Sequence, residues 1–231
     1  MARKRSVIVI MNTNGQKPLL FAYIALLFAL LVLFAVSTVL DEAALKSLLS
    51  EDGPVEIASA ALYFVCAGYV LLKGGLAFLR RWPYFVVIPL LFGMRELDFD
   101  KRFTTIGVLK SKFYVSPLEP WHTKLIVIAL GLAVIVLMVM MVKTHLKGLW
   151  ESVRSGGALG WGVVLVLTML VVSKSLDGLE RKCLSIGLSV APLLAKYSSV
   201  AEEIIELGIP VMMLLLFSHY FSQMEQSTSQ Q

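Results

Sequence analysis

The sequence predicts an all-α membrane protein, a polytopic helix bundle with six transmembrane helices. Hydrophobic residues make up 58% of the 231-residue chain and charged residues only 16%. Soluble domains carry about 25% charged residues, and one soluble core cannot hide so much apolar surface. A mean hydropathy of +0.80, apolar stretches of membrane-spanning length, and basic residues gathered in short segments between them all indicate a chain solvated by lipid.

The predicted helices follow from the length of the apolar stretches. A spanning helix needs about 20 apolar residues, and no stretch shows the alternation of a strand. No linker divides the chain, so we expect one integral membrane domain over residues 1–231. The helices are predicted at 19–40, 54–73, 82–100, 123–142, 157–177 and 202–221, with a polar tail at 222–231.

The first apolar run is longer than a signal peptide requires. A signal peptide has an apolar core of roughly 7–15 residues and a small-residue cleavage site, whereas the run here extends from Leu19 to Leu40. We therefore expect a retained first helix. Met11 is an alternative start to Met1, and the sequence leaves both open.

The basic residues predict the orientation. Ten of the 21 basic residues fall in three short regions between or before the apolar stretches, and the side that these regions share with the C-terminal tail holds only two acidic residues, Glu151 and Glu225. The positive-inside rule then places both chain ends in the cytoplasm, in an N-in/C-in topology. The other 14 acidic residues face the periplasm or exterior of a bacterial inner (plasma) membrane. Topology also explains the net charge of +5, so we expect the lipid bilayer and no nucleic acid as a partner.

Several charges on the acidic side are predicted at membrane depth. The third stretch has only 13 uninterrupted apolar residues, from Trp82 to Met94. They cover about 20 Å at about 1.5 Å per residue, while the hydrocarbon core is about 30 Å thick. We therefore expect the helix to continue through Arg95, Glu96 and Asp98. Each ionisable group at this depth costs about 2.5–3.5 kcal/mol, so these side chains should turn inward and pair.

Carboxylates from several helices are expected to converge on a shared outward-facing site. Glu96 and Asp100 are four residues apart, and Glu203 and Glu206 three apart, so each pair shares a helical face. An excess of carboxylates needs a metal ion, protons or a cationic ligand. Oxygen ligands favour Mn or Mg, and Zn is the third possible metal. The predicted site comprises Glu96 and Glu206 as catalytic residues, Glu56, Asp100, His122, Asp177 and Glu203 as metal ligands, and Arg95, Lys174 and Glu180 as ion-pair support.

Some of these residues also have a purely structural explanation. With Gly53 as N-cap and Pro54 at the first helical position, Glu56 falls where acidic side chains favour the helix dipole. Ser199 and Glu202 match a capping box, so Glu202 is expected to be structural.

Two further features leave alternatives open. Asp177 and Glu180 equally suit a charged helix end, and Arg95 with Glu96 suits an interior ion pair. The apolar stretch 183–195 is too short to span a membrane, so it lies in the interface, re-enters the membrane or packs over the helix ends.

The acidic helix start resembles a group of uncharacterised bacterial multi-pass inner-membrane proteins. The resemblance rests on Glu51-Asp52-Gly53-Pro54-Val55-Glu56 opening one helix and Arg95-Glu96-Leu97-Asp98 closing the next. The chain is also superficially similar to the CREST membrane hydrolases, which include alkaline ceramidases and use acidic and histidine ligands for zinc. It departs from them on its last helix, where Glu203 and Glu206 stand in place of an HxxxH pair.

These observations favour a metal-dependent hydrolase or transferase acting on a lipid-linked substrate. In this hypothesis the metal activates water and Glu96 or Glu206 serves as general base. A proton- or cation-coupled transporter or accessory subunit is the first alternative, because buried carboxylates also form proton relays. A non-catalytic membrane scaffold is the second. The substrate and the oligomeric state do not follow from the sequence.

Overall fold

The computed structural model describes residues 16–48 and 53–229, which are almost entirely helical and contain no strand. The choice between Met1 and Met11, the basic residues Arg3, Lys4 and Arg5, and the residues Glu51 and Asp52 of the acidic helix start lie outside this part of the chain. The helices are α1 (Gln16–Val39), α2 (Glu42–Leu48), α3 (Pro54–Arg81), α4 (Tyr84–Glu96), η2 (Phe99–Arg102), α5 (Ser111–Val115), α6 (Trp121–Arg154), α7 (Ala158–Leu176), α8 (Leu179–Ser185) and α9 (Pro192–Ser229).

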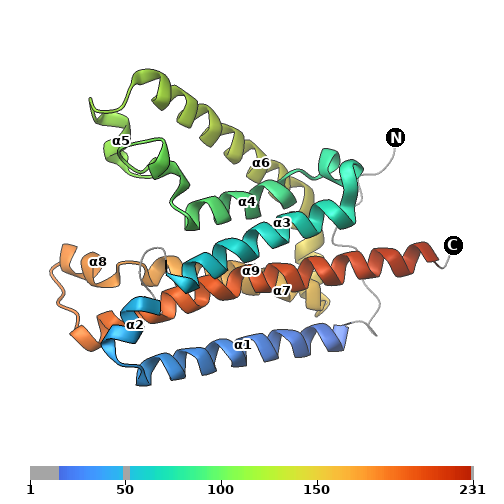
Figure 1. Cartoon of the computed structure of the whole chain (residues 1–231). Helices are drawn as coiled ribbons and strands as arrows, with labels where there is room; N and C mark the ends of the chain where they lie inside the picture. Colours follow the sequence, from blue (N-terminus) through green and yellow to red (C-terminus); the bar gives the residue numbers. More distant parts are fainter. Residues whose placement is uncertain (1–15, 49–52, 230–231) are drawn as a thin grey trace.

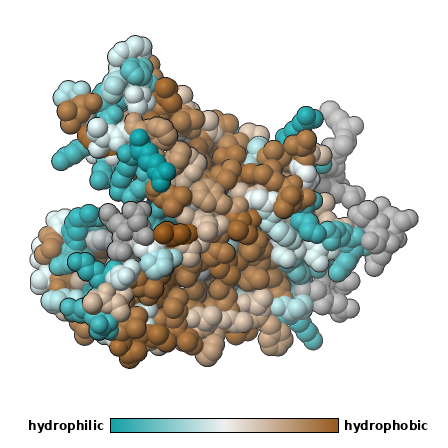
Figure 2. All heavy atoms as spheres, in the orientation of Figure 1, coloured by the Kyte–Doolittle hydropathy of each residue, from teal (hydrophilic) through white to brown (hydrophobic). Residues whose placement is uncertain are grey.

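The long helices form an elongated bundle with distinct ends. In Figure 1, α1, α3, α4, α6, α7 and α9 run lengthwise in alternate directions, while the short α2, α5 and α8 lie together at one end. Figure 2 shows hydrophilic residues at both ends and a broad hydrophobic band between them. We call the end with α5 and α8 the cavity end, for the cavity described below.

Four helices are long and apolar enough to cross a membrane by length and composition: α1, α3, α6 and α7. No residue in the most apolar stretch of α6 is buried in the protein. Apolar side chains that face outward over such lengths need a non-aqueous surrounding. The described part of the chain therefore has the fold of a helical membrane protein.

The start of α3 confirms the predicted cap. Gly53 is the N-cap in an extended conformation, Pro54 occupies the first turn, and Glu56 lies in that turn. Proline suits this position because the backbone N–H of a residue in the first turn has no acceptor within the helix, so its absence costs no hydrogen bond. The helix then extends beyond the predicted residue 73 to Arg81, interrupted by Gly75 at φ 65°.

The predicted continuation of the third helix to residue 100 is wrong. α4 ends at Glu96, and Asp98 adopts a left-handed conformation with φ 45° before the short η2 turn. A residue with positive φ cannot continue a right-handed helix. The 13 residues of α4 span only about 20 Å, so Glu96 sits at the end of a helix and not inside a longer one.

Two other helices extend further than predicted. α6 continues from Trp121 through the basic stretch to Arg154, since that stretch contains strong helix formers and no proline. α9 begins at Pro192, ten residues before the predicted start, so Ser199 and Glu202 lie in its interior. The capping-box interpretation of Glu202 is therefore wrong.

The other end of the bundle is filled by aromatic side chains, and we call it the aromatic end. The Tyr84 hydroxyl and His145 Nε2 lie 2.6 Å apart in a buried hydrogen bond that joins α4 to α6. The Trp82 and Phe85 rings lie 4.9 and 5.4 Å from the His145 ring. From this contact α6 diverges from the other helices toward the cavity end (Figure 1).

Glycine allows close helix packing in the middle of the bundle. A Cβ atom at Gly208 of α9 would lie 2.5 Å from Leu30 Cδ1 of α1 and 2.6 Å from Met169 Cε of α7. Small residues at such contacts let membrane helices approach closely. This packing fixes α9 against α1 and α7, and with it Glu202, Glu203 and Glu206, which lie within the two turns before Gly208.

Candidate functional site

A cavity of about 290 Å³ lies at the cavity end, between the end of α4, the start of α3 and the first half of α9. The segment after α4 forms its remaining wall. Seven carboxylates and three cationic side chains line it, so negative charge is in excess. The lining residues are Glu56, Arg95, Glu96, Asp98, Asp100, Lys101, Gly107, Leu109, Lys110, Glu202, Glu203 and Glu206.

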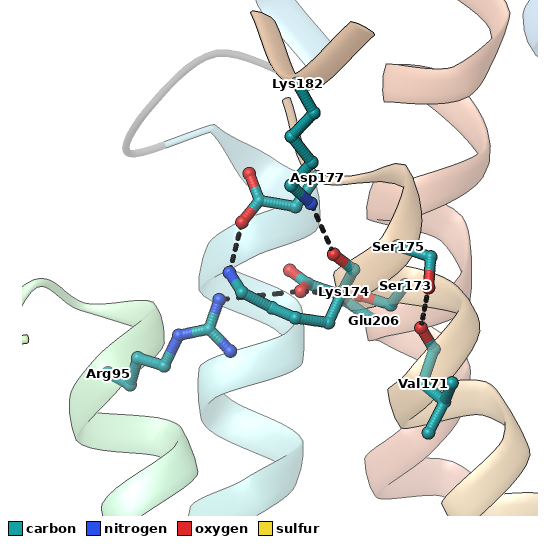
Figure 3. Close-up of polar contacts among 8 residues, drawn as sticks. All are labelled: Arg95, Val171, Ser173, Lys174, Ser175, Asp177, Lys182 and Glu206. Carbon is teal, nitrogen blue, oxygen red and sulfur yellow. Dashed lines mark hydrogen bonds and ion pairs between the residues drawn. The ribbon is translucent and has the colours of Figure 1, made fainter. Parts of the chain in front are cut away.

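Glu206 is held in place by side chains of two other helices. Its Oε1 accepts a hydrogen bond of 2.8 Å from the Ser173 hydroxyl of α7 and lies 3.6 Å from a guanidinium nitrogen of Arg95. Figure 3 shows Arg95 reaching from α4 toward Glu206. The Glu206 side chain is only 12% exposed. The ion pair and the hydrogen bond together join α4, α7 and α9 and keep a carboxylate at the cavity wall.

Glu96 differs from Glu206 in its surroundings. It is buried, with 8% of its surface exposed, and no side chain of the described residues hydrogen-bonds to its carboxyl group. It interacts electrostatically with Arg95, Glu203 and Glu206. The buried hydroxyl-bearing Tyr63 of α3 also lies within electrostatic range of Glu96 and Glu206. Two carboxyl groups with unlike surroundings are the usual arrangement of acid–base pairs in enzymes.

The spacing of acidic residues along α9 explains why three of them reach the cavity. Glu203 precedes Glu206 by three residues and Glu202 precedes it by four, so all three project from neighbouring positions of one helical face. Because α9 begins well before them, none is needed to cap the helix. Sequence reasoning missed Glu202 for this reason, although its i,i+4 relation to Glu206 was visible.

The segment after α4 is shaped by its own acidic residues. Asp98 pairs with Lys101 across the η2 turn. An Asp100 carboxylate oxygen accepts a hydrogen bond of 2.8 Å from the backbone N–H of Val108. These contacts fold residues 98–110 back over the end of α4. They explain why Lys101 and Lys110, which the sequence assigned to no site, line the cavity.

Glu119 ties the same segment to the start of α6. Its Oε1 accepts hydrogen bonds from the backbone N–H groups of Thr105 and Ile106, at 2.6 and 3.0 Å, and from the Thr105 hydroxyl. The Thr105 hydroxyl and these N–H groups favour the charged carboxylate and hold the pKa of Glu119 below the usual glutamate range. Glu119 is thus a structural tether in its ionised form.

Four residues of the predicted site lie outside the cavity lining. Lys174 pairs with Asp177 just after α7, as Figure 3 shows. The hydrogen bond from Lys174 holds the pKa of Asp177 below its ordinary value. His122 is exposed at the start of α6, and Glu180 is exposed on α8. The cavity brings together the other six: Glu56, Arg95, Glu96, Asp100, Glu203 and Glu206.

Among residues 16–48 and 53–229, no three His, Cys, Asp or Glu side chains come close enough to hold a metal ion by themselves. A closed structural metal site of the zinc type needs four such ligands. Mg²⁺ needs fewer, because it keeps several waters and uses one or two protein carboxylates together with the phosphates of its substrate. The donor set of the cavity is compatible with this second kind of binding.

Comparison with protein-family models, with curated proteins and with solved structures gives no match for this chain. The resemblance to bacterial inner-membrane proteins and to CREST hydrolases therefore stays a prediction from the sequence motifs. The function has to be inferred from the chemistry of the cavity and not from a relative.

Proposed function

We propose that the protein is a hydrolase or transferase that acts on a lipid-linked phosphate at the outer surface of a bacterial inner membrane. In this proposal the six lengthwise helices make up the transmembrane bundle, both chain ends lie in the cytoplasm, and the cavity end faces outward. One observation carries it: the cavity combines seven carboxylates with three cationic side chains at one end of an apolar helix bundle.

The mixed charge of the lining supports a metal-bridged phosphate as the ligand. Carboxylates in excess attract a divalent cation, and Mg²⁺ or Mn²⁺ suits oxygen ligands. Arg95, Lys101 and Lys110 offer donors for phosphate oxygens. A purely anionic ligand would be repelled by the carboxylates, and a purely cationic one would be repelled by the three cationic side chains.

The two carboxylates that differ most in their surroundings receive different roles. Glu96, buried and with no hydrogen bond from the described side chains, is the group best suited to take a proton from water or from an acceptor hydroxyl. The oxygen of that water or hydroxyl then bonds to phosphorus, the bond from phosphorus to the leaving oxygen breaks, and the leaving oxygen receives a proton from water. Glu206, held by Arg95 and Ser173, positions Arg95 and adds negative charge for the cation.

Phosphate release from lipid substrates tests this proposal. Purified protein in phospholipid vesicles is incubated with phosphatidic acid or a polyprenyl diphosphate, with Mg²⁺ or with EDTA. We expect Mg²⁺-dependent turnover that falls by about 10²-fold or more in Glu96→Gln, the usual contribution of a general base. Glu225→Gln, an exposed carboxylate at the aromatic end, is the matched control and should turn over normally. Absence of turnover with both substrates, or full activity of Glu96→Gln, would contradict the proposal.

A further inference from the structure

The segment between η2 and α6, residues 103–121, exposes an unusual set of apolar side chains. We call it the α5 segment. Its exposed cationic residues, Lys110 and Lys112, alternate with large hydrophobic ones. Figure 2 shows hydrophobic and hydrophilic residues mixed on the lobe that this segment forms. The side chains that are 72–82% exposed are Phe103, Leu109, Val115, Leu118 and Trp121.

A second segment of the same character lies on the other side of the cavity end. Residues 179–194 comprise α8, the loop that follows it and the first three residues of α9, and we call them the α8 segment. Arg181 and Lys182 are its exposed cations. Its hydrophobic side chains that are 55–72% exposed are Leu184, Ile186, Leu188, Leu193 and Leu194. Figure 1 shows α5 and α8 at the same end of the bundle, with the start of α3 and the end of α4 between them.

Neither water nor the hydrocarbon core suits these segments. Exposing apolar side chains to water costs free energy in proportion to their area, and contiguous patches of them mark interaction surfaces. Lysine and arginine side chains do not fit the hydrocarbon core. The headgroup layer satisfies both kinds of side chain, since aromatic and apolar residues lie among the headgroups and cations meet lipid phosphates.

The position of the segments along the chain brings them to that layer. The α5 segment ends at Trp121, where the apolar helix α6 begins, and the α8 segment starts three residues after the end of α7. Both α6 and α7 are long and apolar enough to cross a membrane. A residue at the end of such a helix lies at the lipid headgroups, and tryptophan is enriched there.

The α5 segment also forms part of the cavity. Gly107, Leu109 and Lys110 line it, and Leu109 is at the same time 82% exposed. The segment therefore forms part of the cavity wall and also carries apolar side chains directed outward. An apolar lip beside a charged cavity fits a molecule with an apolar tail and a polar head.

We infer that the α5 and α8 segments lie in the anionic headgroup layer of the membrane on both sides of the cavity mouth, so that the cavity receives its ligand from the lipid surface. The ligand of the proposed function would then be an amphiphile that enters the cavity from the headgroup layer. The placement of the two segments rests on the membrane-spanning fold and requires no catalytic step.

Fluorescent labels at single cysteines measure the depth of both segments. Cys183→Ser removes the partly exposed thiol, while Cys66 is fully buried and stays. A nitrobenzoxadiazole label is placed at Leu118→Cys or Ile186→Cys in vesicles of phosphatidylcholine and phosphatidylglycerol. Controls are Leu130→Cys, exposed on α6, and Gln226→Cys, exposed near the end of α9.

We expect lipids with a nitroxide near the headgroup to quench Leu118 and Ile186 labels at least threefold more than the Gln226 label. Iodide in water should quench them less than half as well as Gln226. Equal behaviour of the labels at Leu118, Ile186 and Gln226 would overturn the inference. Lys112→Glu combined with Arg181→Glu should reduce lipid quenching at least twofold when phosphatidylglycerol is present, and unchanged quenching would overturn the anionic character of the contact.

The same vesicles separate this inference from the proposed function. Glu96→Gln alters only a cavity side chain, so the labels should be quenched as before. Absent phosphate release with normal quenching contradicts the catalytic proposal alone. Normal phosphate release with water-exposed labels contradicts the headgroup inference alone.

Discussion

The two ends of the bundle are made from the same helices but are packed in opposite ways. At the aromatic end, rings from α3, α4 and α9 contact one another, and Tyr84 and Phe85 of α4 contact His145 of α6, which is buried and hydrogen-bonded to Tyr84. At the cavity end, α3, α4 and α9 present carboxylates to a cavity of about 290 Å³. The helices thus meet through large apolar surfaces at one end and through charged groups at the other.

This difference separates stability from function along the bundle. Buried rings contribute apolar area and ring–ring contacts, which hold the helices together without any ligand. Carboxylates gathered around one cavity repel one another and gain from a cation. We therefore expect substitutions at the aromatic end to change stability and those at the cavity end to change ligand binding and turnover.

The largest expected effect is at the aromatic end. His145→Ala removes the 2.6 Å hydrogen bond to Tyr84 and leaves a void among the rings, so the free energy of unfolding should fall by about 2–4 kcal/mol. Thermal unfolding in detergent measures this, with Tyr84→Phe as a milder control of about 1 kcal/mol. Phosphate release per folded molecule should be unchanged. Lost turnover with unchanged stability would break the division between the ends.

Glu206→Gln is the corresponding change at the cavity end. Glutamine keeps an acceptor for the Ser173 hydroxyl but removes the charge that faces Arg95. We expect Mn²⁺ binding in the presence of a lipid phosphate to weaken at least tenfold, because one charge near a cation contributes several kcal/mol in a partly buried site. Stability should change by only about 1 kcal/mol. Calorimetric titration and thermal unfolding together check both parts, and unchanged affinity would count against the site.

The division between the aromatic end and the cavity end is only partly predictable from the sequence. The start of α3 with its Gly53 cap was predictable, because proline and glycine restrict the backbone locally. The end of α4 was not predictable, because the length of an apolar run indicates only how long a helix must be to cross a membrane and not where the helix ends. α4 ends just before Asp98, which adopts a left-handed conformation. The contacts of the following segment favour this conformation, and the spacing of apolar residues along a helix does not reveal such contacts.

The cavity lining was predictable where residues share a helix and unpredictable where they meet through loops. Helical spacing brought Glu203 and Glu206 together correctly. The course of residues 98–121 decides instead that Lys110 lines the cavity while His122 remains exposed. That course depends on hydrogen bonds such as those of Glu119, and such long-range pairings leave no periodic signal.

A smaller effect is expected from pH at the Glu119 tether. The folded-state pKa of Glu119 is lowered, so its contribution is complete above the unfolded value of about 4.3 and is lost as pH falls through the folded value. Fluorescence of Trp121, in a variant with the other three tryptophans replaced by phenylalanine, should change reversibly in this acidic range. Glu119→Gln retains an acceptor without titrating and should flatten the curve. An identical curve in that variant would exclude Glu119 as the titrating group.

The smallest effect is expected at the exposed ion pair of the aromatic end. Lys73 and Glu225 lie 2.9 Å apart, with side chains 43% and 63% exposed. Glu225→Gln should lower the free energy of unfolding by about 0.2–1 kcal/mol, as for other exposed pairs, and added salt should shrink the difference. A change comparable to that of His145→Ala would show that charge also stabilises this end.

Binding of Mn²⁺ to the protein in lipid nanodiscs tests the central claim most directly. Mn²⁺ replaces Mg²⁺ because both take oxygen ligands, and its paramagnetism allows free and bound ions to be counted. With a short-chain lipid phosphate present, we expect about one bound ion per protein, weaker binding without the lipid phosphate, and loss of binding in the Glu96→Gln, Glu206→Gln double variant. Binding that is absent under all conditions, or equally strong in the double variant, would contradict the assignment of the cavity as the functional end.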